Sequence, residues 1–112
     1  MTFAGDIPKG AKVRFMRANF DKLTSAASDA AIQTQIVNAT PPAFALLISC
    51  VGRKMILSSR TEEEVDAVDE IFKHKTLLSG FYSYGEISPL LKGQGCQLHN
   101  QTMTITTFDE AE

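Results

Sequence analysis

Ala43-Phe44-Ala45-Leu46-Leu47-Ile48-Ser49-Cys50-Val51 is the most apolar run in this sequence of 112 residues. Its apolar residues are continuous rather than alternating, which is typical of a strand that is covered on both faces. Pro41 and Pro42 come just before it and favour an extended approach to the strand. Gly52-Arg53-Lys54 ends the run at a turn. The run therefore predicts a strand at the centre of a sheet.

A helix is predicted on the N-terminal side of this strand. Asn19 is a residue type that caps helices, because its side chain accepts a hydrogen bond from a free N–H group of the first turn. From there, apolar residues recur at intervals of three and four, as expected for one buried helix face. They are Phe20, Leu23, Ala26, Ala27, Ala30 and Ala31. Because most of them are small, we expect this helix to lie close against the sheet.

A second helix is predicted on the C-terminal side, after a short helical turn at Met55-Ile56-Leu57. Thr61 and Glu64 have the spacing of a capping box, in which each side chain bonds a backbone N–H at the helix start. The apolar stripe of this helix consists of Val65, Val68, Ile71 and Phe72. Glutamates fill the first turn and Lys73-His74-Lys75 lies at the end, as the helix dipole favours.

Three further strands are predicted from alternating residues. Lys12-Val13-Arg14-Phe15-Met16-Arg17 has a basic and an apolar face, follows turn residues at Gly5 to Gly10, and suits a sheet edge. Leu77 to Ile87 is the second of these strands. Ser88 to Leu98 contains Pro and Gly and is expected to form a mobile loop. The Thr-rich segment from Gln101 to Phe108 is the last strand, and we expect it to pair antiparallel with the strand before it.

The predicted order is strand, helix, strand, helix, strand, strand. The connection between the first two strands should be parallel and right-handed. We expect an α+β domain, a mixed sheet with the helices packed mainly on one face. It spans residues 1–112, with an N-terminal loop at 1–11 and a frayed acidic tail at 109–112. The uncovered face should expose parts of Phe44 and Leu46, so we expect a two-fold homodimer in isolation.

The composition excludes several classes of protein. A net charge of −2 and a pI of about 5.6 provide no basic surface for nucleic acid or an anionic membrane. No apolar run reaches the length of a membrane span, and the N-terminus lacks a signal-peptide pattern, so we expect a cytoplasmic protein. Cys50 and Cys96 are too few for a disulfide scaffold and should be reduced. His74 and His99 are far apart and predict no zinc site.

Gly80-Phe81-Tyr82-Ser83-Tyr84-Gly85-Glu86-Ile87 contains the first candidate site residues. An extended strand places Tyr82, Tyr84 and Glu86 on one face. A carboxylate on a mostly apolar strand needs a partner, so this face is either a pocket wall or a surface with an exposed glutamate. In a pocket, Glu86 would hold a ligand ammonium group, and a tyrosine would supply a hydroxyl group and a ring face.

Arg53 and Cys50 lie where the central strand meets the next helix. Arg53 can clamp a ligand carboxylate there, or it can pair with Glu86 and tie the two segments together. Both interpretations hold if ligand and Glu86 compete for Arg53. Cys50 is either an inert buried thiol or, beside Arg53 and a helix start, a reactive one.

His99 and Asn100 precede the last strand. His99 can ligate a haem iron, bind a ligand or satisfy loop carbonyl groups, and the third role is favoured. With Cys50, the two residues would supply the nucleophile, base and orienting group of an enzyme. Nothing in the sequence brings these three side chains together, so we do not expect catalysis.

Three segments, in this order and spacing, resemble the C-terminal domain of the FIST family (F-box and intracellular signal transduction). They are Ser49 to Arg53, Gly80 to Ile87, and Leu98-His99-Asn100-Gln101-Thr102. The loop at Gly5 to Gly10, followed by a basic and apolar strand, also fits. The resemblance extends to about Phe108.

The resemblance implies a small-ligand-binding sensory domain of a bacterial signal-transduction protein, with an amino acid or similar metabolite as the ligand. The implied partners are a FIST N-terminal domain, which usually precedes this one, or a histidine kinase, a cyclic-dinucleotide enzyme or a chemoreceptor. Some relatives are haem-based nitric oxide sensors, so haem is an alternative, as is a scaffold that docks a signalling partner without a ligand. Nothing in the sequence resembles an F-box. A ligand held between the two halves would be only partly enclosed by this chain.

Overall fold

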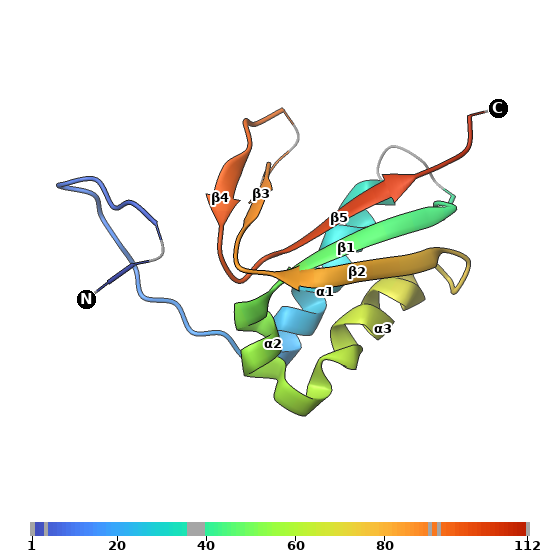
Figure 1. Cartoon of the computed structure of the whole chain (residues 1–112), viewed down its shortest axis with the longest axis horizontal. Helices are drawn as coiled ribbons and strands as arrows, with labels where there is room; N and C mark the ends of the chain where they lie inside the picture. Colours follow the sequence, from blue (N-terminus) through green and yellow to red (C-terminus); the bar gives the residue numbers. More distant parts are fainter. Residues whose placement is uncertain (1, 4, 36–39, 90, 92, 112) are drawn as a thin grey trace.

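The computed structural model describes residues 2–3, 5–35, 40–89, 91 and 93–111. Its main sheet has three strands in the order β2-β1-β5, and β3 and β4 form a separate hairpin (Figure 1). The elements in chain order are α1 (Phe20–Gln35), β1 (Phe44–Cys50), α2 (Val51–Leu57), the 3₁₀ turn η1 (Ser58–Arg60), α3 (Glu62–Ile71), β2 (Leu77–Ser83), β3 (Glu86–Ser88), β4 (Gln97–His99) and β5 (Met103–Phe108). This mixed sheet with helices confirms the predicted α+β class.

Strand β1 occupies the centre of the main sheet, as predicted. It pairs in parallel with β2 and antiparallel with β5. Ala45, Leu47 and Ser49 are buried, whereas Phe44 and its neighbours on the opposite face are only half-buried. The expectation of cover on both faces was therefore wrong. In Figure 1, α1 lies behind the sheet and α2 and α3 lie below it, so no helix of the described residues is drawn over the face toward the viewer.

The helix layer packs against the sheet through small side chains. Asn19 caps α1, because its Oδ1 accepts a hydrogen bond from the backbone N of Lys22 at 2.8 Å. Ala27 and Ala31 of α1 are fully buried and share one cluster with residues of α3 and β1. The predicted close approach of this helix to the sheet is confirmed. Such a cap typically contributes about 0.5–2 kcal/mol to stability.

The predicted capping box at the start of α3 was wrong. Thr61 has helical dihedral angles (φ −62°, ψ −29°), and its side chain makes no capping hydrogen bond. The turn η1 runs directly into α3, so Thr61 continues a helical path and does not begin one. Glu64 therefore does not serve in a cap, and its side chain is buried in the core.

The predicted first strand, Lys12 to Arg17, was also wrong. Residues 11–19 belong to no helix or strand and extend away from the rest of the molecule (Figure 1). The turn before them is present, since the N of Ala11 donates to the O of Pro8 at 3.0 Å and Gly10 has a φ of 86°. That positive φ suits glycine.

Two strand pairings differ from the expectation. The segment Leu77 to Ile87 is not one strand, because β2 ends at Ser83 and β3 begins at Glu86 in the second sheet. Strand β5 pairs with the far edge of β1 and not with β2. The expected loop between Ser88 and Leu98 contains the ends of the β3–β4 hairpin, and two of its residues, Leu90 and Lys92, lie outside the described residues.

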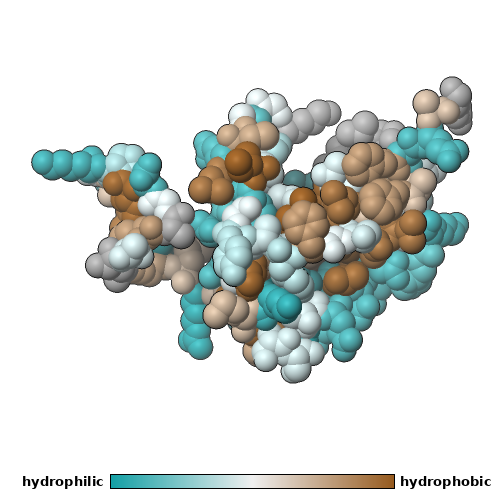
Figure 2. Space-filling view, in the orientation of Figure 1, coloured by the Kyte–Doolittle hydropathy of each residue, from teal (hydrophilic) through white to brown (hydrophobic). Residues whose placement is uncertain are grey.

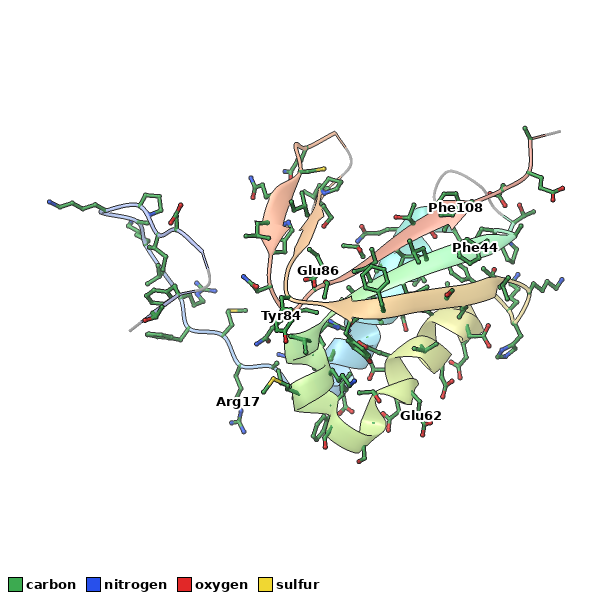
Figure 3. All side chains as sticks on the ribbon, viewed as in Figure 1. Arg17, Phe44, Glu62, Tyr84, Glu86 and Phe108 are labelled. Atoms are coloured by element: carbon green, nitrogen blue, oxygen red, sulfur yellow. The ribbon has the colours of Figure 1, made fainter. Side chains whose placement is uncertain are left out.

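The face of the main sheet that has no helix over it is largely apolar. We call it the open face. Phe44 and Phe108 stack across the β1–β5 pair with ring centroids 5.7 Å apart (Figure 3). By register, Phe81 lies beside Ile48 on this face, and 58% of its surface is exposed. Figure 2 shows apolar side chains gathered over these strands. No helix in the described part of the chain is long and apolar enough to cross a membrane.

Candidate functional site

An ion pair is buried between α2 and α3. Arg53 Nε lies 2.9 Å from Glu64 Oε2, and the two side chains are 2% and 1% exposed. The Nη2 atom of Arg53 donates to the backbone O of Leu23 at 2.7 Å. Arg53 is held on two sides and is not open to solvent as a clamp. Its predicted pairing with Glu86 was wrong, because Glu64 takes that place.

Two hydroxyl groups of the sheet complete the environment of Glu64. Ser49 Oγ on β1 donates to Glu64 Oε1 at 3.0 Å, and Tyr82 OH on β2 donates to the same oxygen at 3.2 Å. By register Ser49 and Tyr82 are neighbours across the β1–β2 pair, so both point toward the helices. Burial and the nearby Glu64 carboxylate raise the pKa of Tyr82. Tyr82 is therefore a neutral phenol that donates to the carboxylate.

A cavity of about 210 Å³ lies between α3 and the sheet, beside this polar cluster. We call it the α3 cavity. Its walls come from β1, α3, β2 and β5, and they are mostly apolar. The lining residues are Leu47, Ser49, Glu64, Val65, Leu78, Ser79, Gly80, Phe81, Tyr82 and Met103. Val65 is 40% exposed and lies toward solvent. The cavity thus combines an apolar wall with one end formed by Ser49, Glu64 and Tyr82.

Gly80 shapes the wall of the cavity on β2. A Cβ atom at this position would lie 2.0 Å from the backbone O of Leu47, so no larger residue fits without moving the strand. The close approach expected for this glycine is present, and it is an approach to protein backbone. Without a side chain here, the space above Leu47 remains open to the cavity.

Glu86 belongs to a second cluster, at the base of the β3–β4 hairpin (Figure 3). Ser83 Oγ donates to its Oε1 at 2.6 Å, and Thr102 Oγ1 donates to its Oε2 at 2.7 Å. The carboxylate is buried and ties the hairpin to β2 and to the segment before β5. His99 is its register partner on β4. The role of this cluster is therefore structural, because its hydrogen bonds hold the hairpin against the main sheet.

The other predicted residues lie outside the α3 cavity. Tyr84 is 90% exposed in the link between β2 and β3, so Tyr82, Tyr84 and Glu86 do not share one face. His99 Nε2 lies 3.1 Å from the backbone O of Ser88, which is the last residue of β3, so His99 contacts a carbonyl group of the neighbouring strand in the β3–β4 hairpin. Asn100 follows β4 directly, and Cys50 is a free, buried thiol at the end of β1. In the described residues, no three metal-ligating side chains gather at one place.

Glu64 and Ser49 are the site residues that the sequence interpretation missed. Glu64 precedes Val68 by four residues, and both are buried on one face of α3. That spacing was the available signal, since a charge on the apolar stripe of a helix needs a buried partner. Ser49 likewise interrupts an otherwise apolar strand.

Comparison with known proteins gives one finding on family. The family model described as "FIST C domain" matches residues 1–89. The match ends just after β3, so Leu98 to Thr102 lies beyond it, although the sequence resemblance was expected to reach Phe108. Searches of curated proteins and of solved structures found no significant match.

Proposed function

The chain belongs to the FIST C domain family, whose members are sensory domains of signal transduction, and from this premise we propose that it binds a small metabolite in the α3 cavity. The observation that carries the proposal is the cavity itself, in which an apolar wall ends at two hydroxyl groups and a carboxylate. Pockets that bind small molecules typically have this composition, with a few polar groups that fix the ligand's orientation.

The size and chemistry of the cavity favour an amino acid or a molecule of similar size. A volume of about 210 Å³ is smaller than the roughly 300–1,000 Å³ of pockets for drug-sized ligands. An ammonium group would lie at the Glu64 end, where Ser49 and Tyr82 also offer oxygen atoms. The apolar part of the ligand would contact Leu47, Val65 and Met103.

Arg53 acts in this proposal as a positioning residue. It holds Glu64 through Nε and is itself held by the Leu23 carbonyl, so the carboxylate keeps one orientation toward the cavity. Lys54 brings a second cation to this end, with its Nζ 5.0 Å from the centroid of the Tyr82 ring. Ligand binding that moves Tyr82 would therefore also disturb α2.

The residues do not fit the haem alternative. Haem is at least as large as a drug-sized ligand and exceeds the α3 cavity. The lining residues include neither His nor Cys, and His99 contacts the Ser88 carbonyl in the β3–β4 hairpin. Of the two sensor functions, we therefore carry forward the small-metabolite sensor and not the haem sensor.

A scaffold function is the second candidate, and the open face favours it. Apolar side chains that stay exposed on a sheet mark interaction surfaces. A FIST N-terminal domain or a signalling protein such as a histidine kinase, a cyclic-dinucleotide enzyme or a chemoreceptor would cover this face. The two functions are compatible, because the α3 cavity lies between α3 and the sheet, and of Phe44, Phe81 and Phe108 on the open face only Phe81 also borders it.

Calorimetric titration with a panel of amino acids tests the proposal, and the chain offers a matched control. Tyr82→Phe keeps the ring but removes the donor to Glu64, so affinity for the bound amino acid should fall about tenfold. Tyr84→Phe makes the same change at an exposed position and should bind like the wild type. Val65→Trp should block the cavity and abolish binding.

Absence of binding by any amino acid or similar metabolite, or equal effects of the two tyrosine substitutions, would overturn the proposed site. A Soret band on addition of haem would overturn the assignment of the ligand class. Binding of a partner protein without any small ligand would favour the scaffold function.

A further inference from the structure

The segment before α1 has the sequence pattern of a β-strand, but in the described structure it is exposed and pairs with no other strand. We call residues 11–19 the N-terminal arm. Val13 and Phe15 alternate with Lys12 and Arg14, so these two apolar side chains share one side of an extended chain. Val13 is 63% exposed and Phe15 is 82% exposed. The described part of the molecule therefore leaves this apolar side largely uncovered.

The main sheet has an edge that can accept such a strand. Among the described residues, β5 pairs only with β1, so the outer N–H and C=O groups of β5 have no strand beside them. Strand β2 leaves a similar edge on the other side. Exposed edges pair readily with extended segments of another chain. The arm could therefore pair with either the β5 edge or the β2 edge.

The handedness of the connections selects β5. Helices α1 and α3 pack on the same face of the sheet, and the chain passes from β1 through α3 to β2. Parallel connections of this type are right-handed in nearly all proteins. A strand that enters β1 through α1 must then lie on the side of β1 opposite to β2. That side is the β5 edge, and α1 already packs beneath β5.

Charge selects the same edge. A strand that enters β1 through α1 runs parallel to β1 and antiparallel to β5, so its start lies beside the end of β5. Lys9 and Lys12 would then lie next to Asp109 and Glu110. At the β2 edge the same lysines would lie beside Lys73-His74-Lys75, which is a repulsive arrangement.

We propose that residues 12–17 add as an antiparallel strand to the β5 edge of a second copy of this chain, and that the two copies exchange arms reciprocally. In the structure the arm projects away from its own β5 edge (Figure 1; Arg17 in Figure 3), so the open position already reaches outward. Each copy has one arm and one unpaired β5 edge, so a two-fold exchange pairs both arms with both edges. The inference does not depend on ligand binding.

Zero-length carbodiimide cross-linking of a mixture of unlabelled and ¹⁵N-labelled full-length protein tests the proposal. Mass spectrometry should find Lys9 or Lys12 linked to Asp109 or Glu110. With equal amounts of the two proteins, half of the linked peptide pairs should combine a light and a heavy peptide. Links confined to pairs of the same isotope would show that the arm folds onto its own chain, and absence of these links would exclude the β5 edge. Either outcome overturns the proposal.

Sedimentation gives an independent readout, carried out in a Phe81→Lys background that places a charge on the open face. The background protein should remain a dimer, and Phe15→Asp should convert it to a monomer with an unchanged circular dichroism spectrum. Phe3→Asp is the control, since Phe3 is also exposed but lies outside the arm. A monomeric background protein, or a dimer that survives Phe15→Asp, would contradict arm exchange.

Discussion

The guanidinium group of Arg53 and the carboxylate of Glu64 are both buried, and they lie 2.9 Å apart between α2 and α3. Removing two such charges from water costs several kcal/mol for each ion, and only close geometry with further hydrogen bonds offsets this cost. Here Leu23 O, Ser49 Oγ and Tyr82 OH supply those bonds. These hydrogen bonds offset the cost of removing the Arg53–Glu64 ion pair from water.

Removing one member of the pair should destabilise the protein strongly. Arg53→Ala leaves Glu64 charged and buried without its cation, so the free energy of unfolding should fall by about 3–5 kcal/mol. Urea denaturation followed by circular dichroism measures the loss. The control is Arg60→Ala, because Arg60 and Glu63 form a pair at 2.6 Å that solvent screens, so its loss should have a much smaller effect. Similar losses for the two variants would show that burial of the Arg53 pair has no energetic consequence.

The exposed His74 provides a test at the residue scale that depends on pH. Its Nδ1 lies 2.6 Å from Asp69 Oδ2, and the hydrogen bond and charge of Asp69 raise the pKa of His74. A raised folded-state pKa means that the stabilisation is fully present below the unfolded value of about 6.5 and disappears as the pH rises through the folded value. NMR titration should find a pKa above that of a free histidine. Asp69→Asn should lower this pKa toward the ordinary value, although Glu70 and Asp66 also raise it, and an unchanged pKa in this variant would refute the assignment.

At the scale of the elements, the contact between β1 and β2 depends on a single glycine. Gly80→Ala would place a methyl group 2.0 Å from the Leu47 carbonyl oxygen, so the two strands must separate. We expect a loss of about 1–3 kcal/mol, as for overpacked cores. Gly95→Ala is the matched control, because a Cβ there meets no atom within 4 Å and should change stability by less than about 0.5 kcal/mol. Thermal unfolding distinguishes the two, and equal melting temperatures would contradict the packing seen at Gly80.

The elements also show how far a sequence can predict this fold. The helix α1 and its buried alanines follow from local spacing, and β1 follows from its length and apolarity. Strand pairing depends on residues far apart in the chain, so neither the place of β5 beside β1 nor the break between β2 and β3 could be read locally. Continuous apolarity indicated cover on both faces of β1, whereas its second face is open.

The candidate site was less predictable than the fold. Arg53 and Tyr82 were recognised, but the partner that joins them was assigned to a helix cap. Thr61 and Glu64 fit both a capping box and a buried carboxylate, and only the path of the chain through η1 decides between them. Glu86 was correctly expected to need partners, which prove to be Ser83 and Thr102. Local patterns thus drew attention to Arg53, Tyr82 and Glu86 but did not identify the side chains that each of them contacts.

At the scale of the whole molecule, the three helices lie on one side of the sheet and leave the open face uncovered. The exposed part of this face includes Leu77 (70%), Phe81 (58%) and Phe108 (50%). Single exposed apolar residues are normal on any protein, but contiguous patches usually mark an interface. Leu77 and Phe81 belong to β2 and Phe108 to β5, and the half-buried Phe44 of β1 pairs with both Leu77 and Phe108, so these side chains form one surface and not scattered points.

We predict that the open face drives association of the isolated chain, as a two-fold dimer that packs face to face. In a chain that lacks residues 1–17, sedimentation velocity at micromolar concentration should still give a dimer, and Phe81→Lys in that chain should shift the equilibrium strongly toward the monomer because it buries a charge in the interface. Leu98→Lys makes the same change at an equally exposed site on the β3–β4 hairpin (59% against 58%) and should leave the dimer intact. Deletion of the arm separates this mode of association from strand exchange at the β5 edge. If the arm-deleted chain is a monomer, the open face does not mediate self-association, and a different partner must cover it.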